Sequence, residues 1–262
     1  MTEDDLIFFK SWFSDFVQYF YSPNKEDQKN ISLKEQHTFN VCENSIEIGR
    51  ELSLGDKDMM LAEAIALFHD IGRFPQYAKY KTFRDRNSVN HGFLGAQTLL
   101  EEKTLQNLSD KEQELIIKAV RFHNAFSIPK MENENIVFFI KLIKDADKLD
   151  IWRVFLEYYE APEKERASAV GLGLPDTTDY SKGVLSCIQK GQMASLSQLK
   201  TLNDFKLMHL SWVYDLKFKP SFRLLSERDY IDKIISHLPK QEEIKKVSLV
   251  LKEFVKGRLK NY

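Results

Sequence analysis

The stretch LFHDIGRF, residues 67–74, places a histidine and an aspartate at the end of an apolar segment. Ala62 and Ile65 precede this pair at helical spacing, so His69 is expected at the buried end of a helix. An imidazole and a carboxylate are costly to bury unless each has a partner. The partner could be another side chain, the backbone or a metal ion. Other parts of the sequence indicate which of these is expected.

The composition describes a globular protein with a proper core. Its 262 residues are 43% hydrophobic and 12% aromatic, and 38 basic against 39 acidic residues give a formal charge of −1, which does not support a nucleic-acid surface. Two cysteines are too few for a disulfide framework or a thiolate metal site. The acidic start, MTEDDL, does not resemble a signal peptide, and the longest apolar run, IVFFI, is far shorter than a membrane span. We therefore expect a cytoplasmic protein that binds neither a membrane nor nucleic acid.

Helical periodicity dominates the chain. Only 10 glycines and 7 prolines interrupt it, and alternating strand patterns are scarce, so the sequence predicts an all-α fold. Expected helices cover residues 3–21, 32–53, 57–70, 88–103, 110–124, 133–159, 163–170, 179–190, 203–217, 227–237 and 240–259. Ser109 and Glu112 form a candidate capping box. The loop GLGLPDTTDYS, residues 171–181, is the predicted boundary between a core, residues 1–170, and a C-terminal helical extension, residues 171–262, packed on that core.

Several metal-capable side chains fall on the apolar faces of these expected helices. Asp147, for example, shares a helix face with Ile140, Ile143 and Ile151. A single buried histidine is most often an ordinary core residue with a hydrogen-bond partner. Five such positions on five helices instead favour a shared site for a divalent cation, because neutral imidazole and carboxylate are ordinary ligands of these ions. The five positions are His37, His69, His91, His123 and Asp147.

The order of these residues resembles that of the HD-domain superfamily of metal-dependent phosphohydrolases. The segments HDIGR, residues 69–73, and KDADKLD, residues 144–150, are similar to it as well, and the resemblance covers roughly residues 30–160. It implies a helical bundle around two divalent metal ions, for which Mn, Fe, Co, Ni, Zn and Mg are all candidates. The implied ligands are His37, His69, Asp70 and Asp147 for one ion, and His91 and His123 for a second ion to which Asp70 is the bridge.

Two such ions suit the hydrolysis of a phosphate ester. A water bound between them has a lowered pKa and can serve as the nucleophile. The sequence contains no G-x-S-x-G, P-loop or HExxH motif that would supply another mechanism. We therefore expect a metal-dependent phosphomonoesterase or phosphodiesterase whose substrate is a nucleotide or another small phosphate ester.

Residues near the HD pair are candidates for catalysis and substrate binding. Asp70 and Arg73 are the expected catalytic residues, since members of the superfamily often carry a lysine or arginine at the latter position that contacts phosphate. The alternative for Arg73 is a surface salt bridge. Gly72 is expected to let the backbone turn away from the site without a crowding side chain. Asp150, one helical turn after Asp147, could orient a ligand, or it could pair with a neighbouring cation.

A basic and aromatic stretch, YAKYKTFRDR at residues 77–86, separates the HD pair from His91. It could bind phosphates by charge and stack a base on a ring, and Lys79, Lys81 and Arg84 are its candidate substrate-binding residues. The alternative is a solvated loop whose aromatic side chains pack locally.

Two other functions remain open. Some proteins of this fold use the same ligand order to hold two irons and activate dioxygen, and four histidines with two carboxylates suit iron well. A metal-binding regulatory module without turnover is the third possibility. The C-terminal helices could supply a homodimer surface.

Overall fold

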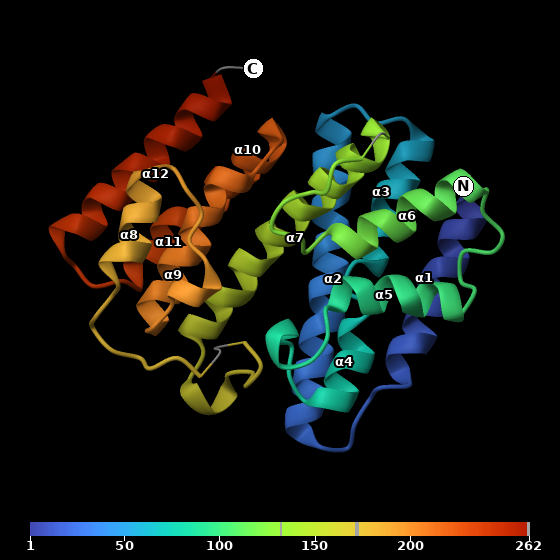
Figure 1. Ribbon diagram of the computed structural model, residues 1–262, viewed down its shortest axis with the longest axis horizontal. Coiled ribbons are helices and arrows are strands. Elements are labelled where there is room, and N and C mark those ends of the chain that lie inside the picture. Colours follow the sequence, from blue (N-terminus) through green and yellow to red (C-terminus); the bar gives the residue numbers. More distant parts are fainter. Residues whose placement is uncertain (132, 171–172, 261–262) are drawn as a thin grey trace. The chain divides into compact units, whose positions relative to one another are not determined.

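The computed structural model describes residues 1–131, 133–170 and 173–260. These residues form helices and loops with no strand among them, which confirms the predicted all-α fold. The chain divides into two compact units, Met1–Asp150 and Ile151–Tyr262 (Figure 1). The expected core and extension, with their boundary at residues 170 and 171, stay a prediction. In the expected loop, Gly171 and Leu172 lie outside the described residues, and residues 173–181 contain no helix.

The first unit contains six complete helices and most of a seventh. They are α1 (Glu3–Gln18), α2 (Lys25–Glu51), α3 (Asp56–Phe68), α4 (Arg73–Tyr80), α5 (His91–Glu101), α6 (Asp110–Phe122) and the first part of α7 (Glu134–Glu160). A short 3-10 turn, Asp85–Asn87, precedes α5. The predicted capping box is present, since Ser109 caps α6 and its backbone N–H donates to Glu112.

Helix α3 lies at the centre of this unit. It is buried along most of its length because α1, α2 and α6 all pack against it (Figure 1). The contact face of α1 repeats every three or four residues, as an amphipathic helix requires, and consists of Leu6, Phe9, Phe13 and Val17. The ring centroids of Phe9 and Phe68 lie 5.2 Å apart, edge to face. Each fully buried side chain of this size contributes about 2–3 kcal/mol. The C-terminal end of α3, which leads into the HD pair, is therefore held firmly in the core.

Glycines allow α5 to lie against the chain that follows α3. A Cβ on Gly72 would lie 2.3 Å from the His91 carbonyl oxygen and 2.6 Å from the backbone nitrogen of Gly95, so only glycine fits there. A Cβ on Gly92 would likewise lie 2.8 Å from the Arg121 carbonyl oxygen at the end of α6. Gly72 was expected to prevent crowding of the site by a side chain. The structure gives a different reason, since the glycine permits direct contact between two backbones.

Four segments differ from the expected helices. Helix α2 begins at Lys25, seven residues before its expected start. Residues 73–80 form α4, although the expected loop begins at residue 77. Pro75 fits in the first turn because the backbone N–H groups there have no hydrogen-bond partner within the helix. Residues 219–227 form α10, where no helix was expected, and Pro220 again lies in the first turn. The expected helix 163–170 is reduced to a 3-10 turn at Glu163–Glu165.

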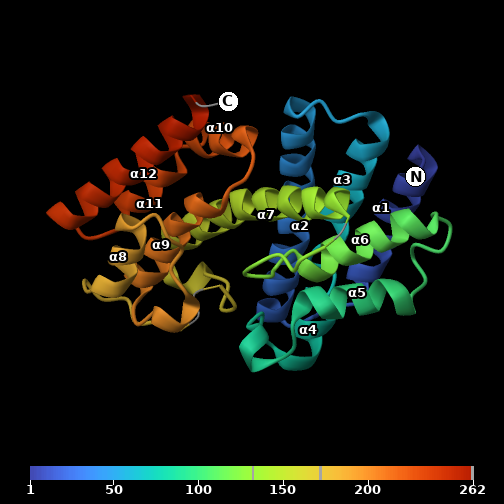
Figure 2. The ribbon, with the colours of Figure 1, turned by 45° about the horizontal axis from the view of Figure 1, so that its top comes forward.

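The second unit is also helical (Figure 2). After the last part of α7 come α8 (Lys182–Gln189), α9 (Leu202–Ser211), α10 (Lys219–Glu227), α11 (Tyr230–Ser236) and α12 (Glu242–Lys260). Helix α9 is buried over its whole length. Its His209 ring stacks on Phe155 with centroids 3.7 Å apart, and neither ring nitrogen has a hydrogen-bond partner in the part of the chain that the structure describes. Within that same part, no helix combines the length and the apolar composition needed to cross a bilayer.

Candidate metal centre

The carboxylate of Asp70 lies at the centre of the buried histidines. Its Oδ2 atom is 3.6 Å from His37 Nε2 and 3.7 Å from His69 Nε2. Its Oδ1 atom is 3.3 Å from His91 Nε2 and 3.7 Å from His123 Nε2. Each oxygen of this one carboxylate therefore faces a different pair of imidazoles, which is the arrangement expected of a ligand that bridges two ions.

The two histidine pairs are built alike. The Nε2 atoms of His37 and His69 are 3.4 Å apart, and those of His91 and His123 are 3.1 Å apart. Together with Asp70 they make two groups of three buried side chains whose ligand atoms are close enough to share a metal ion. The structure thus brings together residues from α2, the end of α3, α5 and the end of α6.

One histidine of each pair is fixed by its own helix. His69 and His123 are the C-cap residues of α3 and α6, and Nδ1 of each lies 2.7 Å from a backbone carbonyl oxygen three residues earlier, that of Ala66 or Val120. The last carbonyls of a helix have no intrahelical partner, so they are free to accept this hydrogen bond. A carbonyl only accepts, so Nδ1 must carry the proton in both rings.

The other histidine of each pair is fixed by a carboxylate. Nδ1 of His37 lies 2.6 Å from Asp150 Oδ2, and Nδ1 of His91 lies 2.9 and 2.8 Å from the two oxygens of Asp85. The structure thus places Asp150 where it can orient a ligand. Asp85 comes from the basic stretch that precedes α5, and sequence reasoning missed it because a 3-10 turn carries no periodic signal. Its only sequence signal is its place six residues before His91.

Protonation at Nδ1 decides what the centre can bind. When Nδ1 donates its proton, Nε2 of a neutral imidazole is left as an acceptor. Two such acceptors face each other in each pair and cannot satisfy one another, whereas a cation between them satisfies both. Metal-ligating histidines characteristically donate their second ring N–H to a carbonyl or carboxylate, as all four of these rings do. The donor set therefore fits divalent metal ions.

Asp147 lies beside the first pair. Its Oδ1 atom is 3.1 Å from His37 Nε2 and 3.8 Å from His69 Nε2. Its side chain retains 17% exposure, against 3% for Asp70. All six sequence-predicted metal ligands are thus gathered in the first unit, with Asp147 at its more open edge.

A comparison with protein families agrees with this geometry. The model of the family described as HD domain matches residues 35–152. This segment is an HD domain. It contains all six clustered residues and belongs to a superfamily of metal-dependent phosphohydrolases that bind divalent metals. Comparison with curated proteins and with solved structures found no match to the chain.

Burial sets the protonation of two histidines in the HD domain, His69 and His91. It lowers the pKa of His69 to about 4 and that of His91 to about 3, so both rings are neutral near neutral pH. Burial acts in the same direction on His37, but hydrogen bonds to Asp147 and Asp150 outweigh it and raise its pKa. When His37 carries a second proton, that proton competes with a cation at the first group, and metal binding there would release it.

Two cations lie against the central carboxylate. Lys34 Nζ is 2.6 Å from Asp70 Oδ2, and Arg73 Nε is 3.3 Å from Asp70 Oδ1. Burial acts to raise the pKa of Asp70, yet these cations and His69 hold it well below its usual value. Arg73 also contacts Asp85, 3.1 Å away. Lys34 was missed by sequence reasoning, although its position one helical turn before His37 is a signal that could have found it.

The expected substrate-binding lysines of the basic stretch already have partners within the protein. Lys79 Nζ lies 5.2 Å from the centroid of the Tyr80 ring, and Lys81 forms an ion pair of 2.7 Å with Asp27. Arg84 immediately precedes the 3-10 turn that carries Asp85. A role of these three residues in substrate binding stays a prediction.

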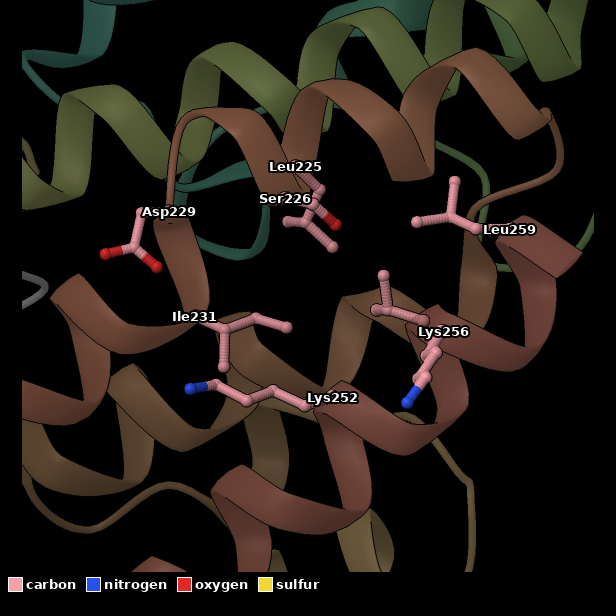
Figure 3. A pocket seen from close by; sticks show the side chains of 8 residues that line it. Leu225, Ser226, Asp229, Ile231, Lys252, Lys256 and Leu259 are labelled. Atoms are coloured by element: carbon pink, nitrogen blue, oxygen red, sulfur yellow. The ribbon is translucent and has the colours of Figure 1, made fainter.

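A separate cavity of about 240 Å³ lies in the second unit (Figure 3). It has apolar walls from Leu225 and Leu259, and charged groups from Asp229, Lys252 and Lys256. It contains no histidine and none of the residues of the HD domain. The cavity is therefore not part of the candidate metal centre.

Proposed function

We propose that the chain is a metal-dependent phosphohydrolase that cleaves a nucleotide or another small phosphate ester. The observation that carries this proposal is the pairing of four inward Nε2 atoms around the two oxygens of one buried carboxylate. That pairing offers two adjacent cation positions, and two-ion centres suit phosphate-ester hydrolysis.

The proposed ligands keep the roles that the family resemblance implies. His37, His69, Asp70 and Asp147 would hold one ion, and Asp70, His91 and His123 the other. Bound divalent ions supply a water of lowered pKa and positive charge for the phosphoryl oxygens. The protein residues orient these groups, because Asp85, Asp150 and two backbone carbonyls fix the imidazole tautomers.

Further assignments accompany this proposal. Arg73 would stabilise charge on the phosphate, and Lys79, Lys81 and Arg84 are the candidates for contacts with the rest of the substrate. The partner is a small molecule, not a membrane or a nucleic acid. We also propose that the chain forms a homodimer through its C-terminal helices.

Turnover of p-nitrophenyl phosphate and bis-p-nitrophenyl phosphate under argon with added Mn²⁺ tests the function. We expect the wild-type chain to cleave at least one ester. Asp70→Ala should lose this cleavage and should also lose at least one bound ion. Asp4→Ala, an exposed aspartate on α1, is the matched control and should behave as wild type. Full metal content and activity in Asp70→Ala would contradict the bridging assignment.

The donor set also keeps a second candidate open. Four imidazoles and two carboxylates are ligands that iron accepts, so a di-iron oxygenase of the same fold is the alternative. Absence of ester cleavage under argon, with oxygen consumption after loading with Fe²⁺, would favour it. A chain that binds the ions and does neither would be a regulatory module without turnover.

A further inference from the structure

Lys34 lies closer to the central carboxylate than any histidine does. It projects from α2 one turn before His37, and its Nζ atom is 2.6 Å from Asp70 Oδ2. Its side chain keeps 16% exposure, whereas that of Asp70 keeps 3%. The ammonium group is therefore the more exposed partner of a buried carboxylate.

Arg73 occupies the equivalent place at the other oxygen. Its Nε atom is 3.3 Å from Asp70 Oδ1, and its side chain is 14% exposed. The ring of Phe83 lies beside both cations, with its centroid 5.6 Å from Lys34 Nζ and 5.8 Å from Arg73 Cζ. Each half of the metal centre is thus flanked by one cation, and the two cations share one aromatic neighbour.

The charges in contact with Asp70 favour an anionic ligand once metal is bound. Two cations, Lys34 and Arg73, contact this one carboxylate. Divalent ions at the centre would add further positive charge. A buried excess of charge is costly unless an opposite charge enters with it. A phosphate ester supplies that charge.

Metal binding would also free the two cations for a substrate. The oxygens of Asp70 that Lys34 and Arg73 now contact are the atoms that face the two histidine pairs. Once those lone pairs are directed to metal ions, the hold of Asp70 on both cations weakens. An ammonium with three donors and a guanidinium fork are then left at the open edge, and both bind phosphate oxygens well.

We infer that Lys34 binds the phosphate group of the substrate together with Arg73. This inference rests on the proposed function, because it assumes that the centre is loaded with two divalent ions. It adds Lys34 to the substrate-binding residues.

The test compares wild type, Lys34→Gln, Lys34→Arg and a matched control, Lys29→Gln, which removes a more exposed lysine from the same helix. Each full-length protein is loaded with Mn²⁺, its metal content is measured, and inorganic phosphate is titrated by calorimetry. We expect unchanged metal content and a phosphate Kd that rises at least about tenfold in Lys34→Gln. Lys34→Arg should restore most of the affinity, and Lys29→Gln should match wild type.

Turnover of the two p-nitrophenyl esters completes the test. We expect Lys34→Gln to raise the KM for the ester that the wild type cleaves and Lys29→Gln to leave it unchanged. Equal phosphate affinity in wild type and Lys34→Gln would overturn the inference while leaving a phosphohydrolase in place. A wild-type chain that binds no Mn²⁺ and cleaves neither ester would contradict the proposed function itself. If metal binds but neither ester is cleaved, the phosphate titration alone decides.

Discussion

Substitution of Asp85 by asparagine should weaken one metal position and spare the other. Both oxygens of Asp85 lie within 2.9 Å of His91 Nδ1, and no other histidine of the centre contacts this carboxylate in the described contacts. A hydrogen bond to a charged acceptor is worth about 1.5–3 kcal/mol, against about 0.5–1.5 kcal/mol for a neutral one. The loss of about 1–1.5 kcal/mol corresponds to roughly tenfold weaker binding, and partners of this kind cost up to about a hundredfold.

Asp150→Asn is the matched perturbation at the other position, since Asp150 holds His37 as Asp85 holds His91. Calorimetric titration with Mn²⁺ should show one weakened and one unchanged binding event in each single variant. Combination with a ligand variant identifies the position. In an Asp85→Asn background, His91→Ala should affect only the binding event that is already weakened, whereas His37→Ala should affect the other one.

Two results would refute this reasoning. If Asp85→Asn weakened both binding events equally, the two histidine pairs would not be separate positions. If it weakened neither, the hydrogen bond from His91 would not fix the ring for metal binding. The thermal midpoint of each variant without metal serves as the control for general damage to the fold.

Three further predictions concern packing and pH. Gly72→Ala should destabilise the chain by about 2–4 kcal/mol and reduce its metal content, because a Cβ 2.3 Å from the His91 carbonyl oxygen forces α5 away; unfolding in urea and metal analysis measure both effects. His209→Leu should stabilise the chain by about 1 kcal/mol at pH 7, since it removes two buried nitrogens without partners in the described residues; a lower urea midpoint would contradict this. The metal-free chain should lose stability as pH falls from 6.5 towards 4. In this range the unfolded chain takes up protons on His69 and His91, whereas the lowered pKa values of both rings keep them neutral in the folded chain. Each of the two groups should therefore cost about 2 kcal/mol of unfolding free energy at pH 5. His37, with its raised pKa, opposes this trend, so a flat or rising stability over that range would mean that it dominates.

The fold class and the positions of the six candidate ligands were predictable because helix faces carry a periodic signal. His37 and Asp147 lie on apolar faces whose spacing alone places them in the core, and the structure brings them within 3.1 Å of each other. The capping box at Ser109 and Glu112 was predictable for a similar reason, since both of its hydrogen bonds are local.

The residues that escaped prediction depend on tertiary contacts. Asp85 lies in a 3-10 turn, and nothing in its immediate sequence indicates that the turn leads back to His91. Lys34 resembles any lysine on a polar stretch of helix until α2 and the end of α3 come together. The role of Gly72 needs the path of α5, which lies nineteen and more residues further along the chain.

The two ways of holding the imidazoles divide the centre into a constant and an adjustable half. His69 and His123 are anchored to main-chain oxygens of their own helices, which no substitution can remove. His37 and His91 are anchored to the side chains of Asp150 and Asp85. Either aspartate can be replaced on its own by glutamate, asparagine or serine. Substitutions at positions 85 and 150, which do not contact the metal, can therefore change the preference for one metal over another. The imidazoles of His69 and His123 keep their positions.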